Sequence, residues 1–259
     1  MSEPHPTMAT RFRIGSVPYL NAAPLTHGLP DVLRLPPSQL ASELHAGRLD
    51  AALLSITEAM GDHGHEVLAN VGILCRGSVF SVGVTHQVPL EQVTAIHLDP
   101  ASCTSVNLLR VLLDSSGLRP RLLPLESPVH AEAHEATLLI GNPAIAFRQN
   151  HPTRPWWDLG EAWWQRERLP FVFAAWVLRR DAPRELRRLL ADAARMGLAR
   201  IGDIAREATD FDEPFRRAYL GGHVQYDLDA AARQGVERFV ARLHEATGMP
   251  CHAPRWAGV

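Results

Sequence analysis

The sequence contains no lysine, and every one of its 26 basic residues is an arginine. A pyridoxal-phosphate Schiff base, a lysine general base and a P-loop each need a primary amine. The guanidinium group of arginine, with a pKa above ~12, cannot replace that amine. These three kinds of chemistry are therefore excluded, whatever the origin of the arginine bias.

Cysteine is scarce as well, and Cys75, Cys103 and Cys251 lie far apart and form no CxxC pair. Neither a disulfide framework nor a zinc site has its usual pattern, so reduced thiols are expected. No stretch approaches the roughly 18 apolar residues of a membrane-spanning helix. The N-terminal segment lacks the apolar core of a secretory signal. The sequence therefore predicts a cytoplasmic protein with no membrane partner.

The chain also lacks an excess of charge and the common catalytic motifs. Its formal net charge of −2 provides no positive field, so no nucleic-acid partner is expected. It has no GxSxG, GxGxxG or HExxH motif. Two histidine pairs, His63/His65 and His130/His134, have spacings that a metal could use, but no cysteine or carboxylate completes a ligand set. We predict solvated histidines, no metal site and no cofactor.

Strand-like and helix-like segments alternate along most of the 259 residues, which predicts an α/β fold with mainly parallel strands. From residue 183 onward the pattern is helical. The order of segments predicts two lobes with a ligand cleft between them, the second (residues 86–173) inserted in the first (residues 1–85 and 174–259). The tryptophan-rich segment 156–170 is expected to be a loop that either covers the cleft or packs between the lobes.

Polar side chains follow several of the predicted strands, and nearly all of them are uncharged. They are Asn21, Ser55, Thr57, Ser78, Ser81, Ser102, Thr104, Ser105 and Asn142. The densest group, in DPASCTSVNLL, opens a predicted helix, where free N–H groups and the helix dipole favour an anion. Ordinary capping of that helix is the alternative, and the residues alone do not decide between the two. Together these side chains predict a site that binds an anion through neutral donors.

Several of these stretches occur together, in the same order, in one known family. They are IGSVPYLNAAPL, GRLDAALLSI, RGSVFSVGV, LDPASCTSVNLLRVLL, LLIGNPAI, DLGEAWW, LPFVFAAWVLRRD and YLGGHVQYDLD. From about residue 13 to residue 239, this order resembles the chorismate dehydratases of the futalosine route to menaquinone. Asn142 stands where that family usually has aspartate. Glu167–Arg168 stands where a threonine–glycine pair is usual, a departure expected to change only a loop tip.

The resemblance implies a two-lobed fold like that of type II periplasmic binding proteins. It also implies a hydro-lyase reaction of menaquinone biosynthesis, the loss of water from chorismate to give 3-[(1-carboxyvinyl)oxy]benzoate. Chorismate, a dianion, is thus the expected small-molecule partner of a protein that is either a monomer or a homodimer. Positioning and fixed dipoles are expected to do most of the catalytic work.

The resemblance further implies roles for individual residues. The expected substrate-binding residues are Tyr19, Ser102, Thr104, Ser105 and Asn142. Asn21 and Ser81 are the expected catalytic residues, near the leaving hydroxyl or the second carboxylate and on opposite sides of the cleft. No histidine, lysine or carboxylate in these motifs is well placed as a base. The substrate's own enolpyruvyl carboxylate is therefore expected to take the ring proton.

Two other functions fit the same residues. The sister 1,4-dihydroxy-6-naphthoate synthases share the fold, but they typically open with an SPCPND-like motif and use a catalytic histidine; the opening Tyr19-Leu20-Asn21 does not match this pattern. A non-catalytic cytoplasmic solute-binding or sensor protein would use the same two-lobe clamp. A fold alone does not decide between an enzyme and a binding protein.

Overall fold

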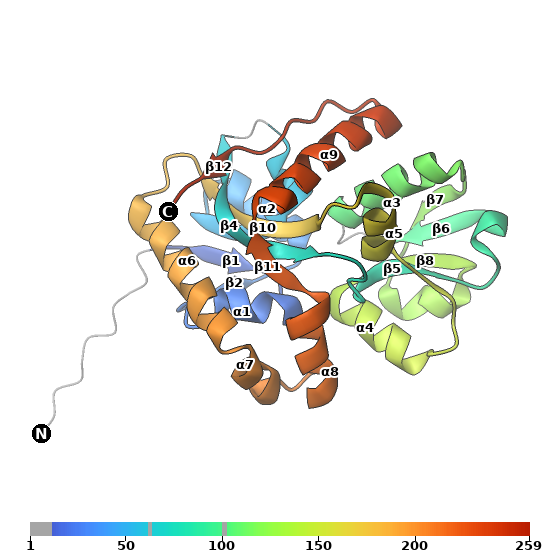
Figure 1. Ribbon diagram of the computed structural model, residues 1–259, viewed down its shortest axis with the longest axis horizontal. Coiled ribbons are helices and arrows are strands. Elements are labelled where there is room, and N and C mark those ends of the chain that lie inside the picture. Colours follow the sequence, from blue (N-terminus) through green and yellow to red (C-terminus); the bar gives the residue numbers. More distant parts are fainter. Residues whose placement is uncertain (1–11, 62–63, 100–102) are drawn as a thin grey trace, which may run out of the picture.

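Two β-sheets form the cores of two lobes (Figure 1). The computed structural model describes residues 12–61, 64–99 and 103–259. Within this part of the chain, the first sheet has seven strands in the order β11-β4-β10-β3-β1-β2, with β12 paired to β4. The second sheet has five strands in the order β7-β6-β8-β5-β9. All strands of the second sheet lie between β4 and β10 in the sequence, so the second lobe is inserted in the first.

The first lobe is built from both ends of the chain. Its strands are β1 (Ile14–Ser16), β2 (Leu33–Arg34), β3 (Ala51–Ser55), β4 (His65–Cys75), β10 (Phe171–Arg179), β11 (Gln225–Leu228) and β12 (Trp256–Ala257). Its helices are α1 (Ala23–Thr26), α2 (Pro37–His45), α6 (Arg184–Ala199), α7 (Ile201–Glu207), α8 (Glu213–Ala218) and α9 (Ala230–Thr247), with short helices η1 (Leu20–Ala22), η2 (Ile56–Ala59) and η5 (Tyr219–His223). In α6, Leu186, Leu190 and Ala194 are buried at intervals of four, so one face of this helix packs inward.

The second lobe comes from the middle of the chain. Its strands are β5 (Val82–His86), β6 (Ala95–Leu98), β7 (Arg121–Pro124), β8 (Ala136–Ile140) and β9 (Trp156–Asp158). Its helices are α3 (Cys103–Ser116), α4 (Gly141–Asn150) and α5 (Leu159–Glu167), with short helices η3 (Leu90–Gln92) and η4 (Pro128–Ala133). Both α3 and α4 follow a strand of this lobe, and their first residues lie at the boundary with the first lobe (Figure 1).

The predicted two-lobed fold is confirmed, but the prediction of mainly parallel strands is wrong. Five of the ten strand pairings between described residues are antiparallel. Four of these five involve β5 or β10, which carry the chain into and out of the second lobe without the crossover connection that a parallel pairing needs. The predicted lobe boundaries, 85/86 and 173/174, fall inside β5 and β10, and the exact boundaries stay a prediction.

The tryptophan-rich segment is not a loop, because it forms β9 and α5. The Asp158 side chain caps α5 by accepting a hydrogen bond of 3.0 Å from the Glu161 N–H. Trp163 is fully buried and meets Phe171 and Phe239 of the first lobe edge to face. Trp163 therefore packs the lobes together, which is one of the two roles predicted for this segment.

Asp158 also fixes the first crossing between the lobes, residues 76–81. Its carboxylate accepts hydrogen bonds from the Ser78 hydroxyl (2.7 Å), the Val79 N–H (3.2 Å) and the Phe80 N–H (2.8 Å). Phe80 has a φ of 67°, a left-handed conformation that costs a non-glycine residue about 1 kcal/mol. The Arg148 guanidinium lies 3.8 Å from the centre of the Phe80 ring and donates to the Phe80 carbonyl at 3.0 Å. These contacts hold the crossing in one shape.

The second crossing follows α5 and contains Glu167 and Arg168. The Glu167 side chain is only 6% exposed, and its carboxylate lies 2.9 Å from Arg242 and 3.6 Å from Arg238 of α9. Arg168 ends α5 with a φ of 53°, a position where glycine is preferred. The departure from the family pattern is therefore not confined to a loop tip, because Glu167 ties α5 to α9.

The left-handed conformation of Arg168 yields a stability prediction. Replacing Arg168 by glycine removes the clash of its Cβ with the backbone and should stabilise the protein by about 1 kcal/mol in urea unfolding. Arg168→Ala is the matched control, because it removes the guanidinium group but keeps the Cβ, and it should give no such gain. An equal gain from both substitutions would show that the side chain, not the backbone, causes the effect.

Candidate active site

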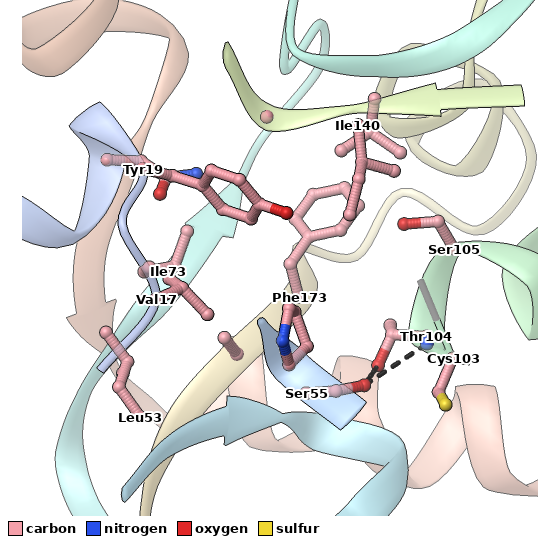
Figure 2. A pocket seen from close by; sticks show the side chains of 15 residues that line it. Val17, Tyr19, Leu53, Ser55, Ile73, Cys103, Thr104, Ser105, Ile140 and Phe173 are labelled. Carbon is pink, nitrogen blue, oxygen red and sulfur yellow. Dashed lines mark hydrogen bonds between the residues drawn. The ribbon is translucent and has the colours of Figure 1, made fainter. Parts of the chain in front are cut away.

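A pocket lies between the two lobes (Figure 2). The lining residues are Val17, Tyr19, Asn21, Pro37, Leu53, Ser55, Ile73, Val82, Cys103, Thr104, Ser105, Ile140, Gly141, Phe173 and Ala174. The first lobe contributes η1 and the strands β3, β4 and β10, and the second lobe contributes β5, β8 and the first residues of α3 and α4. The pocket is open to solvent, and together with the open space at its mouth it encloses about 550 Å³.

Three hydroxyl groups join the lobes at one end of this pocket. The Thr104 hydroxyl, at the start of α3, hydrogen bonds with the Ser55 hydroxyl (Figure 2). It also lies 3.0 Å from the Thr57 hydroxyl oxygen. The Thr57 N–H donates to the Thr104 Oγ1 at 3.2 Å, and the Thr104 N–H donates to the Ser55 Oγ at 3.1 Å. The predicted binding residue Thr104 thus lines the pocket, where its hydroxyl joins α3 to the first lobe.

Ser105 and Ser102 are the other residues predicted to bind the substrate at the start of α3. Ser105 is 4% exposed, and its hydroxyl points into the pocket (Figure 2). Ser102 lies outside the described residues. Cys103 also lines the pocket, and burial, with a smaller contribution from the charge of Glu58, raises the pKa of its thiol to about 11. The start of α3 therefore presents neutral polar groups to the pocket at neutral pH.

Tyr19 lies on the first-lobe side of the pocket, opposite Ser105 (Figure 2). Burial, and next to it the negative charge of Asp99, raises the pKa of the Tyr19 hydroxyl to about 12, so it is a protonated donor at neutral pH. The Tyr19 ring lies over Gly141, the first residue of α4, and a Cβ at that position would come within 3.0 Å of the ring. Gly141 also has a φ of 60°, a left-handed conformation that favours glycine. Both the close approach of the Tyr19 ring and the backbone conformation therefore favour glycine at this position.

Asn142 lies beside the pocket rather than in its lining. Its Oδ1 accepts a hydrogen bond of 3.1 Å from the Leu20 N–H, and its Nδ2 donates to the Asp210 carboxylate at 2.9 Å. Asn142 therefore connects α4 to two segments of the first lobe. The aspartate that is usual at this position would instead face the carboxylate of Asp210. A direct contact of Asn142 with the substrate stays a prediction.

The two predicted catalytic residues both form side-chain hydrogen bonds with a buried tyrosine, Tyr219. Asn21 belongs to η1 and lines the pocket. Ser81 is fully buried at the end of the first crossing, outside the lining, and its Oγ accepts a hydrogen bond of 2.7 Å from the hydroxyl of Tyr219. Contact between Ser81 and a substrate would require the lining to shift, and it stays a prediction.

Among the described residues that line the pocket, none has a charged side chain or an imidazole. The described part of the chain holds no group of three or more His, Cys, Asp and Glu residues that could bind a metal ion. An anion in the pocket would therefore be met by hydroxyl, amide and backbone N–H groups.

No helix in the described part of the chain is both long and apolar enough to cross a membrane.

Two components of the candidate site were not predicted from the sequence. The apolar wall comes from Val17, Leu53, Ile73, Ile140 and Phe173. Val17 follows β1, and the other four lie in strands that are largely apolar on both faces, so no alternation in the sequence separates pocket from core. Tyr219 begins YLGGHVQYDLD, one of the stretches that carry the family resemblance, but nothing in its local sequence shows that it contacts a serine 138 residues away.

The fold of the chain resembles that of solute-binding proteins. A crystal structure of a protein from Archaeoglobus fulgidus matches with a TM-score of 0.69 and 17% identity, over 92% of this chain and 97% of the other. The alkanesulfonate-binding protein SsuA from Xanthomonas axonopodis pv. citri, bound to MOPS, matches with a TM-score of 0.68 and 13% identity, over 96% and 98% of the two chains. At these identities the likeness concerns the fold, which is of the periplasmic-binding-protein type.

The sequence itself is similar to that of a characterised group of proteins. A chorismate dehydratase of Thermus thermophilus is 31% identical, over 92% of this chain and 95% of the relative. The sequence model of a family described as "Menaquinone biosynthesis" matches residues 12–245. The match covers most of the chain and both lobes, so the protein belongs to this menaquinone biosynthesis family.

Proposed function

We propose that the protein is a chorismate dehydratase of menaquinone biosynthesis, a hydro-lyase that removes water from chorismate to give 3-[(1-carboxyvinyl)oxy]benzoate. The observation that carries the proposal is the 31% identity with a chorismate dehydratase over 92% of the chain. The pocket between the lobes supports it, since it offers neutral hydrogen-bond donors and an apolar wall to one small molecule. As the sequence predicts, we place the enzyme in the cytoplasm and assign it no cofactor.

Binding of the substrate would use donors from both lobes. Chorismate carries two carboxylates, and the start of α3, with Thr104 and Ser105, is the proposed site for one of them. The Tyr19 hydroxyl, on the opposite side, is a donor for the rest of the molecule. Helix N-termini and hydroxyl groups bind carboxylates without a cation, and the apolar wall keeps water away from them. Ser102 adjoins the same helix start and stays in the proposed set.

The proposed reaction needs little covalent chemistry from the protein. The bond from the ring carbon to its hydroxyl breaks, the neighbouring ring carbon loses its proton, and the electron pair of that C–H bond completes an aromatic ring. Asn21 and Ser81 are the proposed partners of the leaving hydroxyl. No carboxylate or imidazole occurs among the described lining residues, so we propose that the enolpyruvyl carboxylate of the substrate takes the proton.

The residues that line the pocket argue against a dihydroxynaphthoate synthase but fit a binding protein as well as a dehydratase. The sister dihydroxynaphthoate synthases use a catalytic histidine, and none of the described lining residues is a histidine. A pure binding protein would present the same donors, and the likeness to solute-binding proteins fits that function equally well. Turnover of chorismate separates an enzyme from a binding protein, and the pocket alone does not.

The first test is therefore incubation of the purified protein with chorismate. The proposed function predicts a new aromatic absorption band in the ultraviolet and a product with the mass of chorismate less one water. The thermal unfolding temperature measured in parallel identifies the alternative. A rise in unfolding temperature with chorismate but no product would mean that the protein is a binder.

A second test places a negative charge in the site. Asn21→Asp should lower kcat/KM for chorismate by at least about 100-fold, because a carboxylate a few ångströms from a bound dianion costs roughly 3 kcal/mol. Asn150→Asp is the matched control, since it makes the same change at an exposed position at the far end of α4, and its activity should be that of the wild type. Full activity of a folded Asn21→Asp variant would remove Asn21 from the proposed site.

A further inference from the structure

Tyr219 lies behind the pocket, between the two proposed catalytic residues. It is fully buried, and its ring stacks on that of Phe215 with the ring centres 5.6 Å apart. It is the first residue of η5, a single π-helical turn with the sequence YLGGH. Such turns are rare and often occur at functional sites.

The Tyr219 hydroxyl donates to Ser81, and this fixes the role that Ser81 can play. Because the Ser81 Oγ accepts a hydrogen bond of 2.7 Å from the Tyr219 hydroxyl, the hydroxyl proton of Ser81 is left to donate to another acceptor. The Ser81 carbonyl in turn accepts a hydrogen bond of 2.8 Å from the N–H of Gly141, a residue of the pocket lining. Both the backbone and the side chain of Ser81 are therefore held in place next to the pocket.

Asn21 is the second group that Tyr219 affects. Burial raises the pKa of Tyr219, while side-chain hydrogen bonds with Ser81 and with Asn21 act in the opposite direction. The phenol is therefore a neutral donor throughout the range in which enzymes work. The Asn21 Oδ1 is buried and has no hydrogen-bond partner among the described residues. A buried acceptor without a partner is costly, and in a pocket it marks a place where a ligand can donate.

We propose that Tyr219 is a positioning residue of the dehydratase: it holds the Ser81 hydroxyl as a donor and leaves the Asn21 carbonyl oxygen free as an acceptor. The ring hydroxyl of the substrate has both a lone pair and a proton to offer, so it pairs with both groups at once when the lining shifts to let it reach Ser81. Ser81 then stabilises the charge that develops on this oxygen as its bond to the ring breaks. The proposal rests on the proposed function and adds to it a residue that does not touch the substrate.

The test is the removal of one oxygen atom. Tyr219→Phe keeps the buried ring but removes the donor to Ser81, and kcat should fall about ten-fold with little change in KM, as for the loss of one buried hydrogen bond. Tyr226→Phe is the matched control, since the Tyr226 hydroxyl is also buried in the first lobe but has no partner among the described residues. It should retain the kcat of the wild type, and both variants should unfold as cooperatively as the wild type.

A double substitution separates positioning from a general loss of packing. If Tyr219 acts through Ser81, adding Tyr219→Phe to Ser81→Ala should lower kcat less than two-fold further. Fully additive losses would overturn the inference, and so would a Tyr219→Phe variant as active as Tyr226→Phe. A wild-type protein without turnover would overturn the proposed function itself, and with it the role of Tyr219. An active wild type with an unaffected Tyr219→Phe variant would overturn this inference alone.

Discussion

A pocket that meets an anion without a fixed cation depends on the exact placement of its neutral donors. A hydroxyl or an amide stabilises charge only where its dipole points, whereas a guanidinium group attracts an anion from many directions. In this protein the donors come from two lobes, so their placement depends on how the lobes meet. The carboxylate of Asp158 fixes that geometry at the first crossing, because it binds Ser78, Val79 and Phe80 and also caps α5.

The contacts across the cleft have the same effect at the pocket itself. The Thr104 hydroxyl meets Ser55 and Thr57 at one end, and Asn142 meets Leu20 and Asp210 at the other. These contacts use the same kinds of groups that would bind a carboxylate. A ligand that enters the cleft can therefore exchange one set of hydrogen bonds for another of similar strength, so that neither the empty nor the filled pocket leaves many polar groups without partners.

The order of strand-like and helix-like segments allowed the two-lobed fold to be predicted, because runs such as Ala51–Ser55 and Phe171–Arg179 are apolar and bounded by clear turns. The prediction of a helical pattern after residue 183 missed β11 and β12, which are short strands. The sequence did not allow the strand directions to be predicted, since these follow from the pairing of distant segments. The structured nature of residues 156–167 was missed although the pattern of Asp158 followed three residues later by Glu161 is a helix-start signal. The aromatic residues there suggested a loop that covers the cleft or packs between the lobes, and the buried Trp163 fits the second of these roles.

The candidate site shows the same difference between local patterns, which the sequence reveals, and contacts between distant segments, which it does not. Thr104, Ser105 and Asn21 were predicted because small polar residues after a strand are visible in the sequence, whereas Tyr19 was predicted from the family resemblance; all four line the pocket. The buried position of Ser81 and the contacts of Asn142 could not be found in this way, because each depends on a partner far along the chain. Tyr219 is the extreme case: its importance comes entirely from two residues that only the fold brings to it.

The most direct test of the central claim is a crystal structure of the protein with 3-[(1-carboxyvinyl)oxy]benzoate bound. We predict one carboxylate at the start of α3, within hydrogen-bonding distance of Ser105, and only hydroxyl, amide and backbone N–H groups as the polar partners of the ligand. An arginine paired with either carboxylate would contradict binding by neutral donors. An Asp, Glu or His side chain within about 3.2 Å of the ring carbon that loses its proton would contradict the role of the substrate's own carboxylate.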